Sequence, residues 1–358
     1  MSKVYIILEN GRVFEGESFG AEGEAIGELV FNTGVVGYLE TLTDPSYAGQ
    51  IIMHTFPQIG NYGVIPEDFE SEKCHAKGVV VRDWCKAPSN FRSQGDLDAF
   101  LKQYGVVGIC GVDTREITHI IRETGVMNAM ITPNKPDCVP EAVKNYRVTG
   151  VVAETSCKNA YVVPPEDKIK FDVALIDYGA KQNIIRELRK RGCRITVFPH
   201  DTKAEDMLAS NPDGIVLSNG AGDPAENIVC IEEIRKMLGK KPIFGICLGH
   251  QLLALAMGGK TEKLRYGHRG GNQPVRELES GRVYITSQNH GYEVVSESID
   301  KSARAISYVN LNDNSCEGLV YPSLGAFSLQ FHPEAHAGPR DMEFAFDKFL
   351  DLMKGGRL

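Results

Sequence analysis

The chain has 358 residues, 42% of them hydrophobic and 24% charged, and its 39 Lys and Arg against 47 Asp and Glu give a formal net charge of -8. This length exceeds one comfortable hydrophobic core and predicts about two domains. The acidic balance, without a clustered basic stripe, excludes nucleic acid as an expected partner, because binding phosphates requires concentrated positive charge.

Two further features indicate a cytoplasmic protein. The first residues, MSKVYIILENG, form a short alternating apolar run without the longer apolar core and small-residue cleavage site of a secretory peptide. The nine cysteines include no C-x-x-C pair, which argues against a disulfide framework and against a zinc ribbon. We therefore expect reduced thiols in a reducing compartment.

Residues 1–150 are predicted to form a mixed, β-rich domain. Two alternating runs flank Asn10-Gly11, a pair that favours a tight hairpin turn. Gly-rich strands such as GELVFNTGVVGY and GVVGICGV follow. The next segment, CKNAYVVPPEDKIK, contains Pro164-Pro165 and then charged residues, which is typical of a linker, and we assign the linker to residues 151–170.

Residues 171–358 show regular alternation of strands and helices. The expected strands are FDVALIDYG, RITVFPH, DGIVLSNG and KPIFGIC, and the expected helices are KQNIIRELRKRGC, EDMLAS, ENIVCIEEIRKMLG and LGHQLLALAMGG. Near-continuous apolar strands of this kind predict a parallel sheet covered on both faces. After Gly259 the pattern changes to strands and turns, and PRDMEFAFDKFLDLMKGG closes the chain as an amphipathic helix. The prediction is a doubly wound, mostly parallel α/β domain with an antiparallel addition.

The uncharged run PIFGICLGHQLLALAMGG, residues 242–259, reaches the lower length limit of a membrane span. Proline, glycine and polar residues interrupt it, and a spanning helix would bury His250 and Gln251 at a cost of kilocalories. We therefore expect a buried strand, a turn and an amphipathic helix, and no membrane.

The turn in this run has the spacing G-x-C-x-G, from Gly245 through Cys247 to Gly249. It is the thiol version of the strand-to-helix elbow that exposes a nucleophile at the carboxyl edge of a sheet. The following helix directs its N-terminal amides and positive dipole toward that thiol and stabilises a thiolate. The alternative is an inert core cysteine, and the elbow spacing favours a nucleophile instead.

A thiol nucleophile needs a base, and the base needs an orienting group. In SLQFHPEA, His332 ends an apolar strand, and Glu334 would project to the same side if the chain stays extended. His332 and His336 also have the i, i+4 spacing of a metal pair. However, Glu334 is misplaced for an H-E-x-x-H motif and no third ligand is evident, so we expect no metal site.

Two glycine-rich segments imitate nucleotide-binding motifs. The residues from Gly220 to Ala225 fit a loose G-x-G-x-x-A fingerprint, but they do not follow the first strand, and Pro224 falls within the turn. The segment GGKT, residues 258–261, resembles the end of a phosphate loop. However, the first Gly of that motif would fall at position 254, which is Ala. Bare amides at Gly220 beside a nucleophile serve equally well as an oxyanion hole, which is the interpretation we prefer.

Several of these motifs resemble a known family. GICLGHQ, SNGAGDP, QNHGY and FHPEA are similar to the motifs of the triad-type, class I glutamine amidotransferases, in that family's order. FNTGVVGYLETLTDPSYAGQI, GVDTREITHIIRETG and DYGAKQNIIRELRKRG resemble the small, glutamine-hydrolysing subunits of carbamoyl phosphate synthetases. The resemblance spans nearly the entire chain.

The resemblance implies roles for individual residues. Cys247 would be the nucleophile, His332 the general base and acid, and Glu334 its orienting partner. The amides of Gly220 and Leu248 would form the oxyanion hole. The expected glutamine contacts are Ser46, Gly220, Gly222, Leu248, Gln251, Asn289, Gly291 and Tyr292. Ala221 and Tyr292 depart from the residues usual in the family, Pro and Phe, with little consequence because the neighbours contribute mainly backbone contacts.

The resemblance also implies a partner: a large synthetase subunit that makes carbamoyl phosphate from ammonia, bicarbonate and ATP, for arginine or pyrimidine synthesis. ATP and Mg would belong to that subunit, and no cofactor is expected in this chain. Two rival functions have the same fold: a stand-alone γ-glutamyl hydrolase, and a catalytically silent glutamine-binding module. The N-terminal domain favours ammonia delivery over the first, and an intact Cys247, His332 and Glu334 argues against the second.

Overall fold

The computed structural model describes residues 2–299, 305–335 and 337–358. The chain forms two compact units, Met1–Thr149 and Gly150–Leu358. Each unit has its own hydrophobic clusters, so each is described by itself.

The first unit is built on a closed barrel of mixed strand direction. Its strand order is β1-β2-β8-β6-β4-β3-β9, and β9 pairs with β1 to close it. The bounds are β1 Lys3–Leu8, β2 Val13–Gly20, β3 Ala25–Asn32, β4 Gln50–His54, β6 Gly78–Val80, β8 Val107–Cys110 and β9 Met127–Thr132. The expected hairpin is confirmed, because β1 and β2 pair antiparallel with Ile7 opposite Val13, and Gly11 adopts φ +88° in the turn.

Helices and a small second sheet complete the first unit. They are α1 Tyr38–Thr43, α2 Leu97–Gln103, α3 Thr114–Thr124 and α4 Glu141–Lys144, with the paired strands β5 Gln58–Ile59 and β7 Asp83–Trp84. Ile117 and Ile121 of α3 join one apolar cluster with barrel residues such as Ile6 and Leu29. The prediction of a β-rich domain is confirmed, while barrel closure was not foreseen.

The second unit contains a ten-stranded sheet in the order β10-β12-β11-β13-β14-β19-β18-β16-β15-β17. The strands β12, β11, β13, β14 and β19 run parallel, and β10 and β18 pair antiparallel at either end of this block. Their bounds are β10 Tyr161–Val163, β11 Phe171–Asp177, β12 Cys193–Pro199, β13 Gly214–Leu217, β14 Ile243–Ile246, β18 Cys316–Tyr321 and β19 Ala326–Leu329. The doubly wound, mostly parallel prediction is confirmed.

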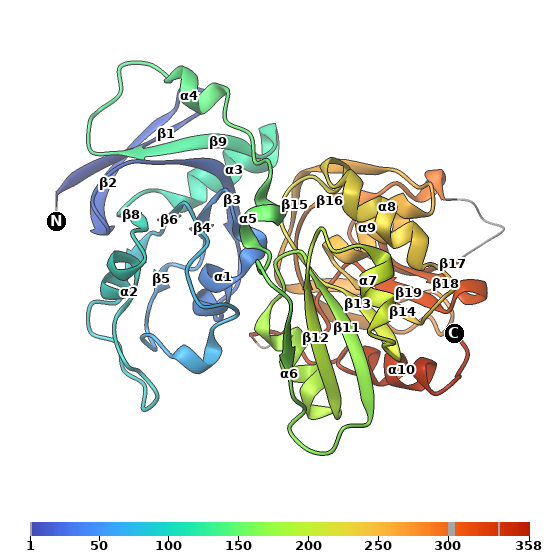
Figure 1. Cartoon of the computed structure of the whole chain (residues 1–358). Helices are drawn as coiled ribbons and strands as arrows, with labels where there is room; N and C mark the ends of the chain where they lie inside the picture. The colour runs from blue at the N-terminus through green and yellow to red at the C-terminus, as the bar shows by residue number, and fades with distance from the viewer. Residues whose placement is uncertain (1, 300–304, 336) are drawn as a thin grey trace. The chain divides into compact units, whose positions relative to one another are not determined.

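Helices cover both faces of this sheet (Figure 1). Because neighbouring strand residues point to opposite faces, Leu175 packs with α6 and α10, whereas Ile176 packs with α7, α8 and α9. The helix bounds are α6 Gln182–Lys190, α7 Ala204–Ala209, α8 Ile228–Met237, α9 Leu248–Ala256 and α10 Phe344–Met353. This two-sided burial explains why the strands are apolar throughout.

The antiparallel addition is longer than the sequence suggested. It consists of β15 Thr261–Glu277, β16 Val283–Val294 and β17 Ala305–Asn310, and it joins the parallel block through β18. Register shifts interrupt the β15–β16 pairing between Lys263 and His268 and again between Gly270 and Gln273. Such irregularities break the alternation of polar and apolar residues, which is why β15 is not readily identified from sequence.

The segment 151–170, expected to be a linker, differs from that expectation. It contains the helix α5 Val151–Thr155 and the strand β10, which pairs antiparallel with β12. Val152 is buried in the apolar cluster of the second unit. Residues 151–170 therefore belong to the second unit, and the division between the units lies at Thr149 and Gly150.

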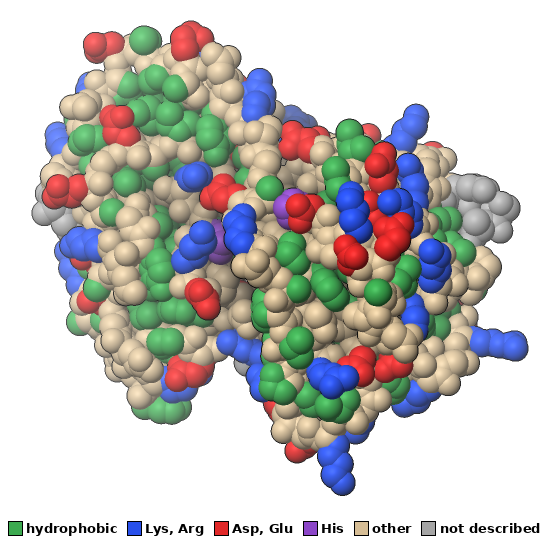
Figure 2. All heavy atoms as spheres, in the orientation of Figure 1, with side chains coloured by type: hydrophobic (Ala, Val, Ile, Leu, Met, Phe, Trp, Pro, Cys, Tyr) green, Lys and Arg blue, Asp and Glu red, His purple; other side chains and the backbone are tan. Residues whose placement is uncertain are grey.

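None of the helices in the described ranges is both long and apolar enough to cross a bilayer. The run 242–259 instead forms β14, a turn and α9, as predicted. On the face drawn in Figure 2, Lys and Arg side chains are interspersed with Asp and Glu. This mixing agrees with the absence of a basic stripe in the sequence.

Candidate active site

Cys247 occupies a strained turn between β14 and α9. Its backbone has φ 52° and ψ -105°, and only two other described non-glycine residues have positive φ. Its amide donates to the carbonyl of Leu329 at 2.8 Å, which ties the turn to the end of β19. A β-carbon residue held at positive φ is costly unless its surroundings enforce it, and such strain is typical of functional turns. The expected elbow is present.

The two glycines of the elbow are sterically required. A Cβ on Gly245 would lie 2.8 Å from the carbonyl oxygen of Gly249. A Cβ on Gly249 would lie 2.2 Å from the carbonyl oxygen of Leu217, at the end of β13. The amide of Gly249 also donates to the Ser218 carbonyl at 3.0 Å. The first turn of α9 therefore packs directly on the backbone that follows β13, and only glycine fits there.

His332 and Glu334 form a buried pair near this elbow. His332 follows β19 and bridges to Ser287 of β16, whose carbonyl accepts its amide hydrogen at 2.9 Å. Its Nδ1 lies 2.7 Å from Glu334 Oε1, and Lys181 Nζ lies 3.4 Å from the same oxygen. Both His332 and Glu334 are buried, with 3% of their surface exposed. The carboxylate thus fixes the orientation of the imidazole, but it does so through a turn from His332 to Ala335 instead of the extended chain that was expected.

The charges of this pair favour the ionised forms of both side chains. Burial lowers the pKa of His332 and Lys181 lowers it further, but the Glu334 carboxylate and the Cys247 side chain outweigh them, so the pKa of His332 is raised. Burial raises the pKa of Glu334, but His332 and Lys181 outweigh it, so the pKa of Glu334 is lowered. An imidazolium beside a carboxylate is the stable state of this buried pair.

The remaining nitrogen of His332 is available for chemistry. Among the described residues, its Nε2 has no hydrogen-bond partner, although it is buried. The Cys247 thiol interacts electrostatically with the same imidazole. Cys247 Sγ lies 3.7 Å from the Asn289 carbonyl oxygen and 3.7 Å from Gln330 Nε2. A buried ring nitrogen without a partner beside a buried thiol is the arrangement expected of a base and its nucleophile.

The residues expected near the oxyanion lie at the same carboxyl edge of the sheet. Gly220 follows β13, and a Cβ there would lie 2.4 Å from the Tyr178 carbonyl oxygen and 2.6 Å from Leu248 Cδ2. Gly220 is therefore in close contact with the residue after β11 and with the first residue of α9. Leu248 begins α9, where amides have no partner within the helix. Gly222, two residues beyond Gly220, adopts φ +88°.

The other predicted glutamine contacts fall into two groups. Gln251, on α9, donates from Nε2 to the Tyr292 carbonyl at 2.8 Å and to Gln330 Oε1 at 2.9 Å, so it joins α9 to the QNHGY segment. Asn289, Gly291 and Tyr292 belong to that segment, on β16. Ser46 lies in the first unit, in the 3₁₀ turn Pro45–Tyr47, where its amide donates to Asp44 Oδ1 at 2.9 Å.

The motif alternatives can be compared with the structure. Gly220–Ala225 leads into a 3₁₀ turn, Pro224–Glu226, instead of opening a long helix as a dinucleotide site would. The GGKT segment follows the end of α9 at Ala256 and leads into β15, instead of preceding a helix as a phosphate loop does. Of the pair His332 and His336, His336 lies outside the described residues.

Sequence reasoning missed two polar residues beside the triad, Lys181 and Gln330. Lys181 comes directly after the β11 loop DYGA, and Gln330 comes directly after β19. The signal was available, because polar residues that follow adjacent parallel strands meet at one edge. A buried ammonium near Glu334 and an amide near Cys247 were the features to look for.

Comparisons with known proteins identify the family of each unit. The family model "Carbamoyl-phosphate synthase small chain, CPSase domain" matches residues 6–131, and "Glutamine amidotransferase class-I" matches residues 174–352. A carbamoyl phosphate synthase small chain from Listeria monocytogenes serotype 4b (strain F2365) is 48% identical over 358 residues, covering 99% of this chain and 98% of its own. One from Clostridium perfringens (strain 13 / Type A) is 49% identical over 352 residues, covering 97% and 99%.

The parallel sheet, the cysteine elbow and the matched segment define the second unit as a class I glutamine amidotransferase domain. The first unit is matched independently, and full-length relatives are nearly half identical to the chain. The chain belongs to the carbamoyl phosphate synthase small chain family. Both levels of the resemblance drawn from its motifs are thereby confirmed.

Proposed function

We propose that this chain hydrolyses L-glutamine to glutamate and ammonia, with Cys247 as the nucleophile, His332 as general base and acid, and Glu334 as its orienting group. The observation that carries the proposal is the buried His332 nitrogen without a partner beside a thiol on a strained elbow. The family of the chain supports the same activity, because its relatives are named as synthase small chains and its second unit is an amidotransferase domain.

The mechanism follows from the positions of these groups. The Cys247 sulfur attacks the side-chain amide carbon of glutamine and forms a tetrahedral adduct whose oxygen carries negative charge. His332 donates a proton to the nitrogen as the carbon–nitrogen bond breaks, which releases ammonia and leaves a γ-glutamyl thioester. The imidazole then takes a proton from water, whose oxygen attacks the thioester carbon; the carbon–sulfur bond breaks, which releases glutamate and restores the Cys247 thiolate beside the protonated His332. No cofactor bound by this chain is required.

Backbone amides and nearby polar groups would hold the substrate. The amides of Gly220 and Leu248 would donate to the oxyanion; Gly220 follows β13 and Leu248 follows Cys247 at the start of α9, which supports this role. Gly222 follows β13, Gln251 lies on α9, and Asn289, Gly291 and Tyr292 lie on β16, and these residues would contact the substrate. The contact predicted for Ser46 stays a prediction. The side-chain amide of Gln251 already has two protein acceptors, so we assign it the role of fixing the pocket wall.

A small chain implies a large one, and we propose that ammonia passes to a large synthetase subunit that uses ATP, Mg²⁺ and bicarbonate to make carbamoyl phosphate in the cytoplasm. Affinity purification from the native source is expected to recover that subunit with this chain. Glutamine, ATP and bicarbonate should then yield carbamoyl phosphate. A chain that purifies alone and releases all its ammonia to solvent would instead be a stand-alone hydrolase.

Replacing Glu334 with Gln is expected to lower kcat by about 10²–10⁴-fold, because the imidazole loses the carboxylate that orients it and stabilises its charge. The carboxylate raises the pKa of His332, so its loss lowers that pKa. The alkaline limb of the pH profile of kcat/KM should therefore move to lower pH. Steady-state kinetics from acid to alkaline pH measure both effects.

The matched control is Lys181→Met, since the ammonium of Lys181 lowers the pKa of His332. Its loss should move the alkaline limb in the opposite direction, to higher pH. Limbs that move the same way in both variants would contradict the assignment of His332 as the titrating acid. Circular dichroism of each variant confirms that the fold is retained.

A further inference from the structure

A second cluster of titratable side chains lies in the antiparallel addition, on three strands that are distant in sequence. His268 is on β15, His290 on β16 and Glu317 on β18, and all three are buried. His268 Nδ1 lies 3.4 Å from Glu317 Oε1, and His290 Nε2 lies 3.9 Å from the same oxygen. One potential ligand atom from each residue therefore falls within 4.8 Å of the other two.

The outer atoms of these side chains are held by other groups. His268 Nε2 lies 2.7 Å from Asp313 Oδ2, and His290 Nδ1 lies 2.8 Å from the Tyr292 carbonyl oxygen. Glu317 Oε2 accepts from Gln288 Nε2 at 3.0 Å. Histidines that bind metals almost always donate their outer N–H to a carboxylate or a backbone carbonyl, which fixes the tautomer and aims the inner nitrogen at the ion. Both histidines here have such an outer partner.

The surroundings of His290 point to a cation. Both of its ring nitrogens face oxygen acceptors: Nδ1 faces the Tyr292 carbonyl at 2.8 Å, and Nε2 faces Gln288 Oε1 at 3.2 Å. The Gln288 amide is oriented by its Nε2, which donates to Glu317 and to Thr286 Oγ1 at 3.1 Å. An imidazole with one proton satisfies only one acceptor. The other nitrogen then presents a lone pair to an oxygen, and a bound cation between them would turn this repulsion into attraction.

We propose that His268 Nδ1, His290 Nε2 and Glu317 Oε1 bind one divalent transition-metal ion of the zinc class. Ligands about 2.0–2.2 Å from such an ion in tetrahedral geometry lie about 3.3 Å from one another. His268 Nδ1 and Glu317 Oε1 have this separation already, at 3.4 Å, whereas His290 Nε2, 3.9 Å from Glu317 Oε1, would move closer when the ion binds. The ion would tie β15, β16 and β18 together, one residue from Asn289, whose carbonyl faces Cys247 Sγ. It takes no part in the proposed hydrolysis. The expectation of no metal rested on the pair His332 and His336; His268, His290 and Glu317 share no recognisable ligand spacing in the sequence.

Cobalt(II) is the probe, because its visible absorption bands report coordination geometry and its thiolate charge-transfer bands reveal cysteine ligands. The full chain carrying Cys247→Ser is expected to bind one cobalt ion with tetrahedral nitrogen and oxygen coordination. Glu317→Gln in that background should weaken binding more than about 100-fold. Asp313→Asn, which alters only the outer partner of His268, should weaken it by about 10–100-fold. Absorption titration measures all three affinities.

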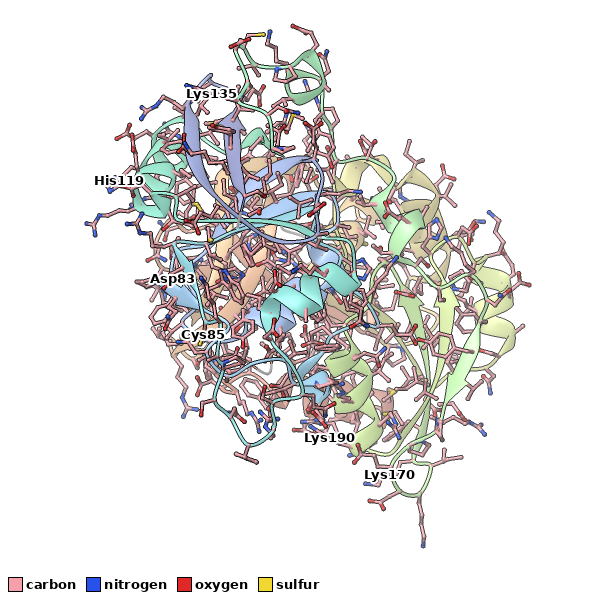
Figure 3. All side chains as sticks on the ribbon, turned by 90° about the vertical axis from the view of Figure 1, so that its left-hand side faces the viewer. Asp83, Cys85, His119, Lys135, Lys170 and Lys190 are labelled. Atoms are coloured by element: carbon pink, nitrogen blue, oxygen red, sulfur yellow. The ribbon has the colours of Figure 1, made fainter. Side chains whose placement is uncertain are left out.

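The matched control is His119→Gln on α3, since His119 is exposed and points away from the first unit in Figure 3. That variant should bind cobalt with unchanged affinity. Anomalous scattering from a cobalt-soaked crystal of the unsubstituted chain tests the site without relying on any variant. Unchanged affinity in Glu317→Gln, or an anomalous peak absent from between the three ligand atoms, would overturn the proposal.

Discussion

Substituting Cys247 with Ser is expected to lower glutamine-dependent activity by about 10⁴-fold or more, the scale on which loss of a nucleophile acts in a catalytic triad. Serine preserves the size and position of the side chain. However, its hydroxyl is far less acidic than a thiol, so a much smaller fraction is ionised and able to attack the amide carbon. Glutamate release in a coupled assay measures the loss, and a trapped thioester should disappear with it.

The same variant separates the two halves of the proposed reaction. With the large subunit present, synthesis from added ammonia should survive in Cys247→Ser, because it bypasses the thioester. Cys230→Ser is the matched control: Cys230 is buried on α8, its Sγ donates to the His200 carbonyl at 3.3 Å, and burial raises its pKa to about 12. That variant should retain glutamine-dependent activity. If Cys247→Ser still used glutamine at the native rate, another residue would be the nucleophile.

Replacing Gly249 with Ala should destabilise the second unit by about 3 kcal/mol or more and abolish glutamine hydrolysis. The new methyl group would sit 2.2 Å from the Leu217 carbonyl oxygen, a backbone atom that cannot rotate away. Relief requires α9 to separate from β13. That movement displaces Cys247 and Leu248 together and breaks the hydrogen bond from the Gly249 amide to the Ser218 carbonyl. Urea denaturation measures the change in the free energy of unfolding.

Gly271→Ala provides the comparison within the same unit. A Cβ there would meet its nearest neighbour, Ser287 Oγ, at 3.4 Å, an ordinary contact, and its φ lies outside the left-handed region. Its free energy of unfolding should change by less than about 1 kcal/mol. Equal unfolding midpoints for Gly249→Ala and the unsubstituted chain would show that the elbow tolerates a side chain and that its glycines are not sterically required.

The linear sequence carried most of the information about the second unit. Continuous apolar strands alternating with amphipathic helices predicted the doubly wound sheet, because burial on both faces leaves that pattern in each strand. The G-x-C-x-G spacing identified the elbow, since a tight strand-to-helix turn needs glycine on each side of the nucleophile. The spacing of His332 and Glu334 also pointed to a pair, but the expected extended chain is wrong: the chain turns between His332 and Ala335, and the carboxylate meets the imidazole within that turn.

Other features exist only in three dimensions. The barrel closes because β9 pairs with β1. Residues 161–163 of the expected linker form the strand β10 because they pair with β12. Neither pairing leaves a local signal in the sequence. Lys181 reaches Glu334 only because two distant strands end at the same edge of the sheet. The His268, His290 and Glu317 cluster likewise requires three strands to pair in one register. Sequence thus determined what local periodicity and spacing encode, and tertiary structure decided every contact whose partners are far apart in the chain.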